Sequence, residues 1–241
     1  MRVLLLSTIL GAATASAQTS ITSSDAADAA ERLSGRRAHM GASMRRLAGA
    51  RMQGTAVTMR LVRDDQASLS VEGLKAIRVV EDAPRGSAIV VCSDGDPDFA
   101  VFGPTFAVLA KARGLAGFVV DGGMRGLADL RRIGVPAFAR SGVPGSAGGH
   151  YRLVTVNDTV SCSGVRIAPG DIVVGDEDGV SVIPKEISAD ALAKATELRA
   201  EKEAMLPLIA RLGSYTKAAE EYRRKREALR ANSDKGRQRS P

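Results

Sequence analysis

Aromatic residues are scarce in this sequence: they occupy 3% of its 241 positions, and tryptophan is absent. Proteins that bind single-stranded nucleic acid commonly stack the bases on aromatic side chains. The composition therefore argues against that class. Apolar residues nevertheless make up 44% of the chain, which is enough for one aliphatic core of ordinary domain size.

Metal-binding and nucleophile motifs are scarce as well. The two cysteines, Cys92 and Cys162, are far apart and form no C-x-x-C motif, and there are only two histidines. A structural zinc site is therefore not expected. The sequence also has no phosphate-loop motif, no G-x-S-x-G motif and no internal repeat. Two alternatives remain for the cysteines, a disulfide in an exported protein or buried thiols in a cytoplasmic one.

The positive charge is concentrated at one end of the chain. Residues 223–241 hold eight lysines and arginines against two acids, which accounts for nearly all of the net charge of +7. The body is close to neutral, so the basicity belongs to a tail that we expect to be disordered. Nucleic-acid binding through this tail is the weaker alternative.

The first 17 residues are typical of a secretory signal. Arg2 precedes an apolar run from Val3 to Leu10, and Ala15-Ser16-Ala17 matches the A-x-A cleavage pattern. The run is too short for a stable transmembrane helix. Export is the prediction, and a cytoplasmic protein with an apolar leader or a misassigned start is the alternative. The expected organisation is a signal peptide at 1–17, an α/β domain at 18–186, C-terminal helices at 187–222 and the tail at 223–241.

The stretch from 103 to 129 contains the candidate site. Gly103 and Pro104 suit the start of a helix that Gly114 ends. The apolar run 117–120 predicts a buried strand, followed by a turn at 121–123 and then by Arg125.

Two features of this stretch suit the binding of an anion. The backbone amides of Thr105 and Phe106 lie at a helix N-terminus, where carboxylates and phosphates bind. Arg125 follows a strand end, where open α/β sheets hold ligands, and its guanidinium matches a carboxylate or a keto-acid oxygen. A plain β-α-β unit with a solvated arginine would give the same pattern.

The remaining patterns complete an α/β fold. Helices are predicted at 22–34, 70–80, 188–211 and 216–230, with Pro207 kinking the third or starting a new helix. Strands are predicted at 57–62, 88–92, 134–140, 153–157, 165–167, 171–174 and 180–183, and loops at 35–49 and 94–98. The loop at 94–98 holds three aspartates and is read as a solvated turn, although a metal site there is conceivable.

The central stretch resembles the family of the regulator of ribonuclease activity A and the class II 4-hydroxy-4-methyl-2-oxoglutarate aldolases. The resemblance extends over residues 20–220 and rests on several motifs in the right order. The matching residues are Gly103, Ala110-Lys111, Gly114, Gly117, Val119, Asp121-Gly122 and Arg125, with further matches at 39–41, 54–58, 136–140, 162–174 and 178–184.

The resemblance implies a swivelling β/β/α domain and a homotrimer or hexamer. It also implies a lyase that uses Mg²⁺ or Mn²⁺ to cleave 4-hydroxy-4-methyl-2-oxoglutarate or to decarboxylate oxaloacetate. Arg125 would bind the 2-oxo oxygen, and the helix start at Gly103, Pro104, Thr105 and Phe106 would bind the carboxylate. A C-terminal acid, for which Glu203 is the candidate, would reach the site of a neighbouring subunit.

Two positions depart from the family pattern. The metal-binding aspartate that follows the arginine is Gly126 here, and the acid after the first glycine is Pro104. Asp129 is the candidate replacement ligand, with Asp121 as a second. The alternative function is a catalytically impaired member that binds a protein or a 2-oxo acid. Family relatives are mostly cytoplasmic, which opposes the export prediction.

Overall fold

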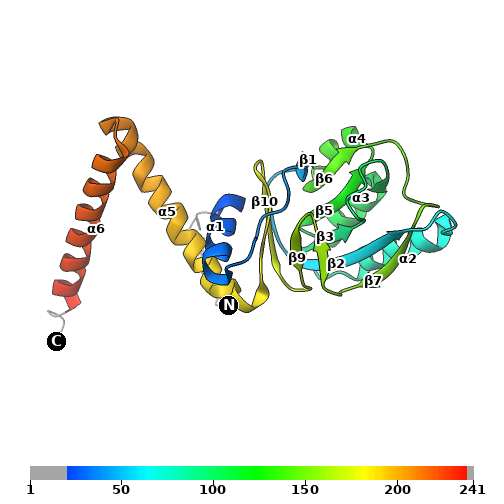
Figure 1. Ribbon diagram of the computed structural model, residues 1–241, viewed down its shortest axis with the longest axis horizontal. Helices are drawn as coiled ribbons and strands as arrows, with labels where there is room; N and C mark the ends of the chain where they lie inside the picture. Colours follow the sequence, from blue (N-terminus) through cyan, green and yellow to red (C-terminus); the bar gives the residue numbers. More distant parts are fainter. Residues whose placement is uncertain (1–20, 238–241) are drawn as a thin grey trace, which may run out of the picture.

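The protein is represented by a computed structural model that describes residues 21–237. The signal-like segment at 1–17 lies outside the described residues. Figure 1 shows a sheet with its covering helices at one end and two long helices that extend away from it at the other. Within the described part of the chain, no helix combines the length and the apolarity needed to cross a bilayer.

A mixed sheet forms the centre of the domain (Figure 1). Its order is β1-β6-β5-β3-β2-β10-β11, and β2, β3, β5 and β6 run parallel. Two further strands attach beside this path, β4 to β5 and β7 to β2. The bounds are β1 Arg45–Ala48, β2 Met52–Arg63, β3 Ser87–Cys92, β4 Ala100–Phe102, β5 Gly117–Met124, β6 Ala137–Gly142, β7 Tyr151–Val156, β10 Ile172–Asp176 and β11 Gly179–Ile183.

Successive side chains of each strand point to opposite faces of the sheet, so the core has one part on each face. On β5, Phe118 and Val120 pack with helices α2 (Leu69–Asp82), α3 (Pro104–Arg113) and α4 (Leu127–Ile133). Val119 packs on the opposite face, against the hairpin of β8 (Val160–Cys162) and β9 (Val165–Ile167). Both faces of the parallel strands are therefore covered, which explains their continuous apolar sequences.

A third cluster joins the N-terminus to the C-terminal helices. Helix α1 (Ser23–Ser34) packs with α5 (Ser188–Leu212) and with the β10–β11 hairpin, and α6 (Tyr215–Arg237) folds back along α5; a short 3₁₀ turn at Lys185–Ile187 precedes α5. The carboxylate of Asp25, fully buried, pairs with Lys202 at 2.7 Å and so ties α1 to α5. Burial raises the pKa of Asp25, but its hydrogen bonds from Lys202 and Thr22 lower the pKa by more. The carboxyl therefore stays ionised.

The structure confirms the mixed α/β class and corrects several local predictions. β5 continues through residues 121–124, where the sequence predicted a turn, because β4 and β6 pair with Gly123 and Met124 from either side. Helix α5 continues through Pro207 and ends at the left-handed Gly213, so no new helix begins at the proline. The helix predicted at 216–230 is confirmed as part of α6, which continues to Arg237 and so includes residues 223–237 that were also assigned to the tail. β1, β4, β8 and α4 were not predicted.

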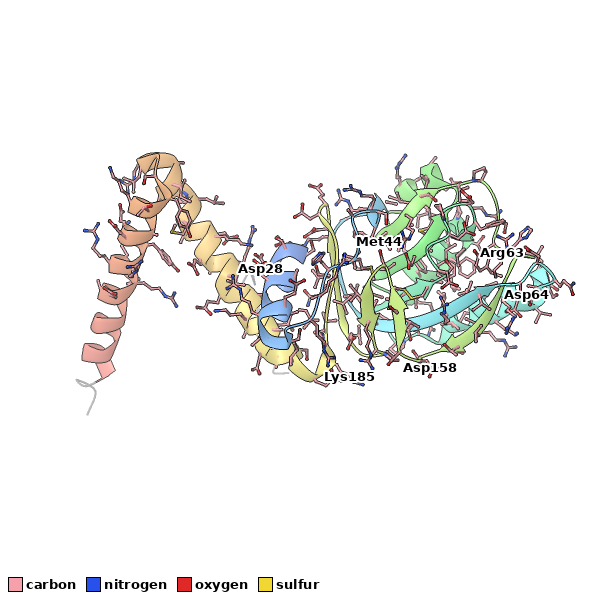
Figure 2. The ribbon with its side chains drawn as sticks, viewed as in Figure 1. Asp28, Met44, Arg63, Asp64, Asp158 and Lys185 are labelled. Atoms are coloured by element: carbon pink, nitrogen blue, oxygen red, sulfur yellow. A yellow bond between two sulfur atoms is a disulfide. The ribbon has the colours of Figure 1, made fainter. Side chains whose placement is uncertain are left out.

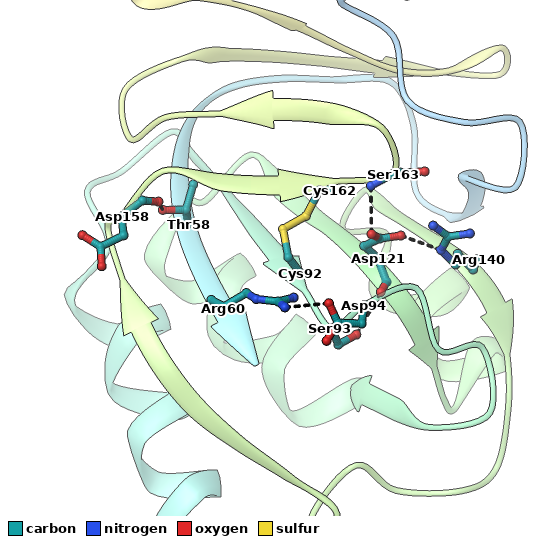
Figure 3. The surroundings of a disulfide bond; sticks show 10 residues. All are labelled: Thr58, Arg60, Cys92, Ser93, Asp94, Asp121, Arg140, Asp158, Cys162 and Ser163. Carbon is teal, nitrogen blue, oxygen red and sulfur yellow. Dashed lines mark hydrogen bonds and ion pairs between the residues drawn. A yellow bond between two sulfur atoms is a disulfide. The ribbon is translucent and has the colours of Figure 1, made fainter. Parts of the chain in front are cut away.

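The two cysteines form a disulfide (Figure 3). Cys92 ends β3 and Cys162 ends β8, and their Cα atoms are 5.4 Å apart. The bond fastens the β8–β9 hairpin to a central strand. Of the two alternatives left open by the sequence, the structure shows the disulfide, the form that oxidising compartments maintain.

Reduction of this disulfide should lower the free energy of unfolding measurably. The bond spans a sequence separation of 70 residues, for which chain-entropy reasoning gives about 4 kcal/mol. Urea unfolding with and without dithiothreitol measures the effect, and Cys92→Ala/Cys162→Ala is the control that reductant should not change. Equal stability of the oxidised and fully reduced wild type would contradict the expectation.

The N-cap of α1 provides a second stability test. The Thr22 hydroxyl accepts a hydrogen bond from the amide of Asp25, and the Asp25 carboxylate accepts one from the amide of Thr22. We expect Thr22→Ala to cost about 1 kcal/mol. Ser68→Ala is the matched control, because Ser68 precedes α2 without a side-chain capping bond. The role assigned to the cap is wrong if urea unfolding shows the same loss for both variants.

Candidate active site

Arg125 lies where β5 ends and close to the start of α3. Its amide donates to the carbonyl of Phe102, at 3.1 Å, which fixes the backbone beside β4. A Cβ atom at Gly103 would lie 3.2 Å from the Cγ of Arg125. Gly103 has an extended backbone that other residues also adopt, so the glycine matters here for space, since a Cβ atom would push the arginine side chain aside. Its missing side chain lets the arginine lie against the helix start.

The guanidinium of Arg125 is available for a ligand. The residue is exposed, and among residues 21–237 its side chain has no hydrogen-bond or ion-pair partner. Other arginines near this end of the sheet already form ion pairs, Arg60 with Asp94 and Arg140 with Asp121. A planar donor fork without a protein acceptor suits a carboxylate or a keto oxygen.

Helix α3 begins beside this arginine without a capping side chain. Gly103 is the N-cap and Pro104 takes the first helical position. Within the described residues, the amides of Thr105 and Phe106 therefore have no side-chain acceptor, and they point out of the helix N-terminus. The ring of Phe106 stacks on Phe102 at 4.3 Å between centroids, which holds the first turn in place. The arrangement confirms the helix start that the sequence predicted.

A pocket of about 230 Å³ contains both features. One border is the helix start, from Gly103 to Phe106, together with Arg125. The other border comes from α2 and from the segment that leads into β7. Its members are Leu69, Glu72, Gly73, Ala76, Ser146, Ala147, Gly148 and Tyr151. The pocket thus lies where the carboxyl ends of parallel strands meet covering helices, as is usual in α/β folds.

Comparison with known proteins identifies the family. The profile described as RraA-like, Aldolase/RraA, matches residues 23–182, which is more than half of the chain. This chain belongs to the RraA-like family. The match includes the whole of the pocket and Arg125.

Some RraA-like relatives are named as aldolases, and others are described as members of a ribonuclease-inhibitor family. A Halalkalibacterium halodurans protein, provisionally named a 4-hydroxy-4-methyl-2-oxoglutarate aldolase, is 38% identical over 56% of this chain and 64% of its own length, so the match spans just under two thirds of that relative. A Thermus thermophilus 4-hydroxy-4-methyl-2-oxoglutarate aldolase is 27% identical over 56% of this chain and 77% of its own length. Among solved structures, Streptomyces coelicolor RraAS2, described as an unusual member of the RNase ES inhibitor RraA family, has a TM-score of 0.66 at 26% identity, covering 76% of this chain and 91% of its own.

Solved structures also support the fold beyond the matched region. An uncharacterised Pseudomonas syringae protein has a TM-score of 0.75 and covers 84% of this chain and 90% of its own, at 24% identity. This agreement shows the fold alone. Together with the family match, it confirms the RraA-like α/β domain that the sequence motifs predicted.

The two candidate aspartates lie away from the pocket's ligand-binding groups. Asp121 is buried on the hairpin face of β5, where its carboxylate pairs with Arg140 and accepts the amide of Ser163 at 2.9 Å (Figure 3). Asp129 is exposed on α4 and pairs with Arg132 at 2.8 Å. Neither residue lines the pocket.

Glu203 and the carboxylates of the aspartate loop do not line the pocket either. Glu203 lies on α5 and pairs with Arg199 at 2.8 Å, and α5 extends from the side of the sheet away from α3 (Figure 1). Figure 2 shows the length of the domain: Asp28, on the helix α1 that packs with α5, lies at the opposite end from Arg63 and Asp64. In the aspartate loop, Asp94 pairs with Arg60, and Asp96 accepts the hydroxyl of Tyr151 at 2.6 Å. These carboxylates stabilise the loop and do not converge on a common point.

The described residues offer no preformed cluster of ligands for a divalent metal ion. Magnesium and manganese need oxygen ligands, usually at least one carboxylate. Within residues 21–237, no group of three histidines, cysteines, aspartates or glutamates is placed to hold a metal. At the position of the family's metal ligand, Gly126 has no side chain.

The two departures from the family pattern touch each other. A Cβ atom at Gly126 would lie 2.5 Å from Cγ and 2.7 Å from Cδ of Pro104. The proline ring therefore fills the space that a side chain at position 126 would need. Gly126 also has a left-handed φ of 69°, which non-glycine residues adopt at a cost. Pro104 and Gly126 form a matched pair.

Sequence reasoning missed Glu72 and Tyr151, which also line the pocket. The Glu72 carboxylate accepts the amide of Leu153 at 2.6 Å and the ammonium of Lys75 at 2.7 Å. Burial raises the pKa of Glu72, but these two bonds lower the pKa by more, so the carboxylate stays charged. Burial and then the bond to Asp96 raise the pKa of Tyr151 to about 12. No local motif marks either residue, since only the packing of α2 and β7 brings them to the pocket.

The matched pair gives a double-mutant prediction. We expect Gly126→Asp to lower the free energy of unfolding by about 2–3 kcal/mol, from the left-handed backbone and the overlap with the ring. Pro104→Ala removes the two contacting ring atoms, so the double variant should recover about 1–2 kcal/mol of this loss. Urea unfolding of the wild type, of both single variants and of the double variant gives the four free energies of this double-mutant cycle. Additive losses would show that the two positions do not interfere.

Proposed function

We propose that the pocket at Arg125 binds a pyruvate-type 2-oxo acid and that the chain is a lyase for such acids. One observation carries this proposal: a guanidinium with no partner among the described residues faces the same pocket as an uncapped helix N-terminus. The amides of Thr105 and Phe106 would hold the carboxylate, and Arg125 would hold the adjacent keto oxygen. The aldolase names among the RraA-like relatives support the same reaction class.

In the proposed reaction, negative charge develops on the 2-oxo oxygen of the substrate. When the bond between C3 and C4 breaks, its electron pair remains on C3 and is delocalised onto the 2-oxo oxygen as an enolate. C4 departs as a carbonyl after its hydroxyl proton passes to solvent water, or as carbon dioxide when C4 is a carboxylate. A proton from solvent at C3 completes pyruvate. The guanidinium of Arg125 would stabilise the enolate by donating hydrogen bonds to the oxygen on which the charge develops.

The candidate substrates are 4-hydroxy-4-methyl-2-oxoglutarate and oxaloacetate. The expectation of Mg²⁺ or Mn²⁺ comes from the family resemblance, and the described residues hold no preformed cluster of its ligands, so no step here depends on it. A homotrimer or hexamer remains part of the proposal. The exposed Glu203 on α5 would then face a neighbouring copy, and light scattering with size-exclusion chromatography tests the assembly.

The second candidate is a binding or regulatory protein without turnover. Pro104 and Gly126 favour it, since they replace both acids of the family pattern with a matched pair. The description of the Streptomyces coelicolor structure, as a member of an RNase ES inhibitor family, supports inhibition of an enzyme as a function for this fold. Arg125 and the open helix start favour the lyase, because protein binding does not require them.

Arg125→Ala should reduce pyruvate release strongly. Loss of one preorganised donor to a developing oxyanion costs roughly 10²–10³-fold in kcat. We expect that loss in a coupled assay of pyruvate from oxaloacetate and from 4-hydroxy-4-methyl-2-oxoglutarate, run with and without Mg²⁺ or Mn²⁺.

Arg132→Ala is the matched control, because Arg132 is an exposed arginine of α4 outside the pocket. Full activity of Arg125→Ala would show that the site is wrong. No turnover by the wild type under any condition would favour the binding function.

A further inference from the structure

A second cavity, of about 260 Å³, lies where the chain leaves α1 and meets the β8–β9 hairpin. It shares no residue with the pocket at Arg125. Arg36 and Arg37 line it from the loop that follows α1, and Arg166 lines it from β9. All three arginines are exposed, so a ligand in the cavity can reach each of them.

The guanidinium of Arg37 is held against the hairpin. Its Nε donates to the carbonyl of His39 at 2.8 Å. A Cβ atom at Gly164 would lie 3.0 Å from its Nη1 and 3.4 Å from its Cζ, so the planar group lies directly on the backbone of the hairpin turn. Within the described part of the chain, its two Nη groups have no acceptor. Their donors are therefore available beside β9.

Arg36 and Arg166 add two more cations to the cavity. Among residues 21–237, neither side chain forms a hydrogen bond or an ion pair. Val165 and Ile167 are buried on either side of Arg166, so the alternation of β9 directs this arginine away from the core. The disulfide fastens the same hairpin to β3 (Figure 3). Guanidiniums around one cavity repel one another, and an anion between them would replace that repulsion with attraction.

Two acids also line the cavity, and they have different roles. Asp171 is buried, and its carboxylate accepts the amides of Ala168 at 2.8 Å and of Lys185 at 2.9 Å. Glu186 is exposed on the 3₁₀ turn, and within the described residues its carboxylate has no partner. A free carboxylate accepts hydrogen bonds from hydroxyl groups and repels a second anionic group.

We propose that this cavity binds a phosphate monoester of a small polyhydroxylated molecule, such as a sugar phosphate. A phosphate monoester carries nearly two negative charges and three acceptor oxygens, which suits three guanidiniums better than a single carboxylate does. Glu186 would accept a hydrogen bond from a hydroxyl group of the ligand. The inference goes beyond the proposed lyase function and does not depend on Arg125.

Four probes separate the parts of this ligand. Ribose 5-phosphate carries both parts, inorganic phosphate and ribose carry one each, and malonate is a dianion without a phosphate. In isothermal titration calorimetry of the full chain at low ionic strength, we expect ribose 5-phosphate to bind severalfold more tightly than inorganic phosphate. Malonate should bind roughly tenfold more weakly than ribose 5-phosphate, and ribose should show no binding. Arg125→Ala should leave all four results unchanged.

Arginine variants assign the phosphate to this cavity. Arg37→Ala and Arg166→Ala should each weaken ribose 5-phosphate and inorganic phosphate roughly tenfold, because a hydrogen-bonding partner of the anion is lost. Arg166→Lys keeps the charge without the planar fork and should have a smaller effect. Arg78→Ala is the matched control, because Arg78 is an exposed arginine of α2 outside the cavity. Circular dichroism establishes that each variant is folded.

An acid variant assigns the hydroxyl groups. Glu186→Ala should weaken ribose 5-phosphate severalfold, through the lost acceptor, and should leave inorganic phosphate equal or tighter, through the lost negative charge. Glu81→Ala is the control, because Glu81 is an exposed acid of α2 outside the cavity.

Several results would overturn the proposal. Absence of phosphate binding to the wild type would do so, as would equal affinities in the wild type, Arg37→Ala and Arg166→Ala. An equal loss in Arg78→Ala would show unspecific attraction to positive charge. Malonate as tight as ribose 5-phosphate would refute the phosphate class, and an unchanged ribose 5-phosphate affinity in Glu186→Ala would refute the hydroxyl contact. The lyase assays with Arg125→Ala are independent of all these outcomes.

Discussion

The close approach of Arg125 to the backbone of Gly103 determines the geometry of the pocket. The end of β5 and the start of α3 lie so near that a Cβ atom at residue 103 would be 3.2 Å from the Cγ of Arg125, and the arginine would have to shift to make room for it. The bond from the amide of Arg125 to the carbonyl of Phe102 fixes the same contact from the backbone side. A free guanidinium and free helix amides consequently face one pocket. The parallel sheet positions this contact, since β4 and β5 are neighbouring strands whose carboxyl ends lie at one edge.

The same contact explains how the chain differs from the pattern of its family. Pro104 and Gly126 flank Gly103 and Arg125 in the sequence, and they meet in space directly beside them. A proline ring occupies the position where the pattern has acids. The binding groups for a 2-oxo acid are therefore retained while the carboxylate at position 126 is excluded by packing as well as by sequence. This combination favours an anion site that relies on arginine and backbone amides.

Much of this arrangement could be predicted from the sequence. The signals for α3 are local, with Gly103, Pro104 and Gly114 at its ends, and the buried runs of β3 and β5 are continuous because both faces are covered. β4 and the last residues of β5 could not be predicted in this way. Their strand structure depends on neighbours distant in the sequence, and Asp121-Gly122-Gly123 resembles a turn when read alone. Glu72 and Tyr151 were missed for the same reason, since tertiary packing alone brings them to the pocket.

A crystal structure of the protein with pyruvate is the decisive test of this binding site. We predict the carboxylate of pyruvate at the amides of Thr105 and Phe106, with its 2-oxo oxygen within hydrogen-bonding distance of the guanidinium of Arg125. We also predict that Pro104 and Gly126 stay in contact. Pyruvate bound elsewhere, or bound here through a metal ion with Arg125 turned away, would contradict this assignment of the site.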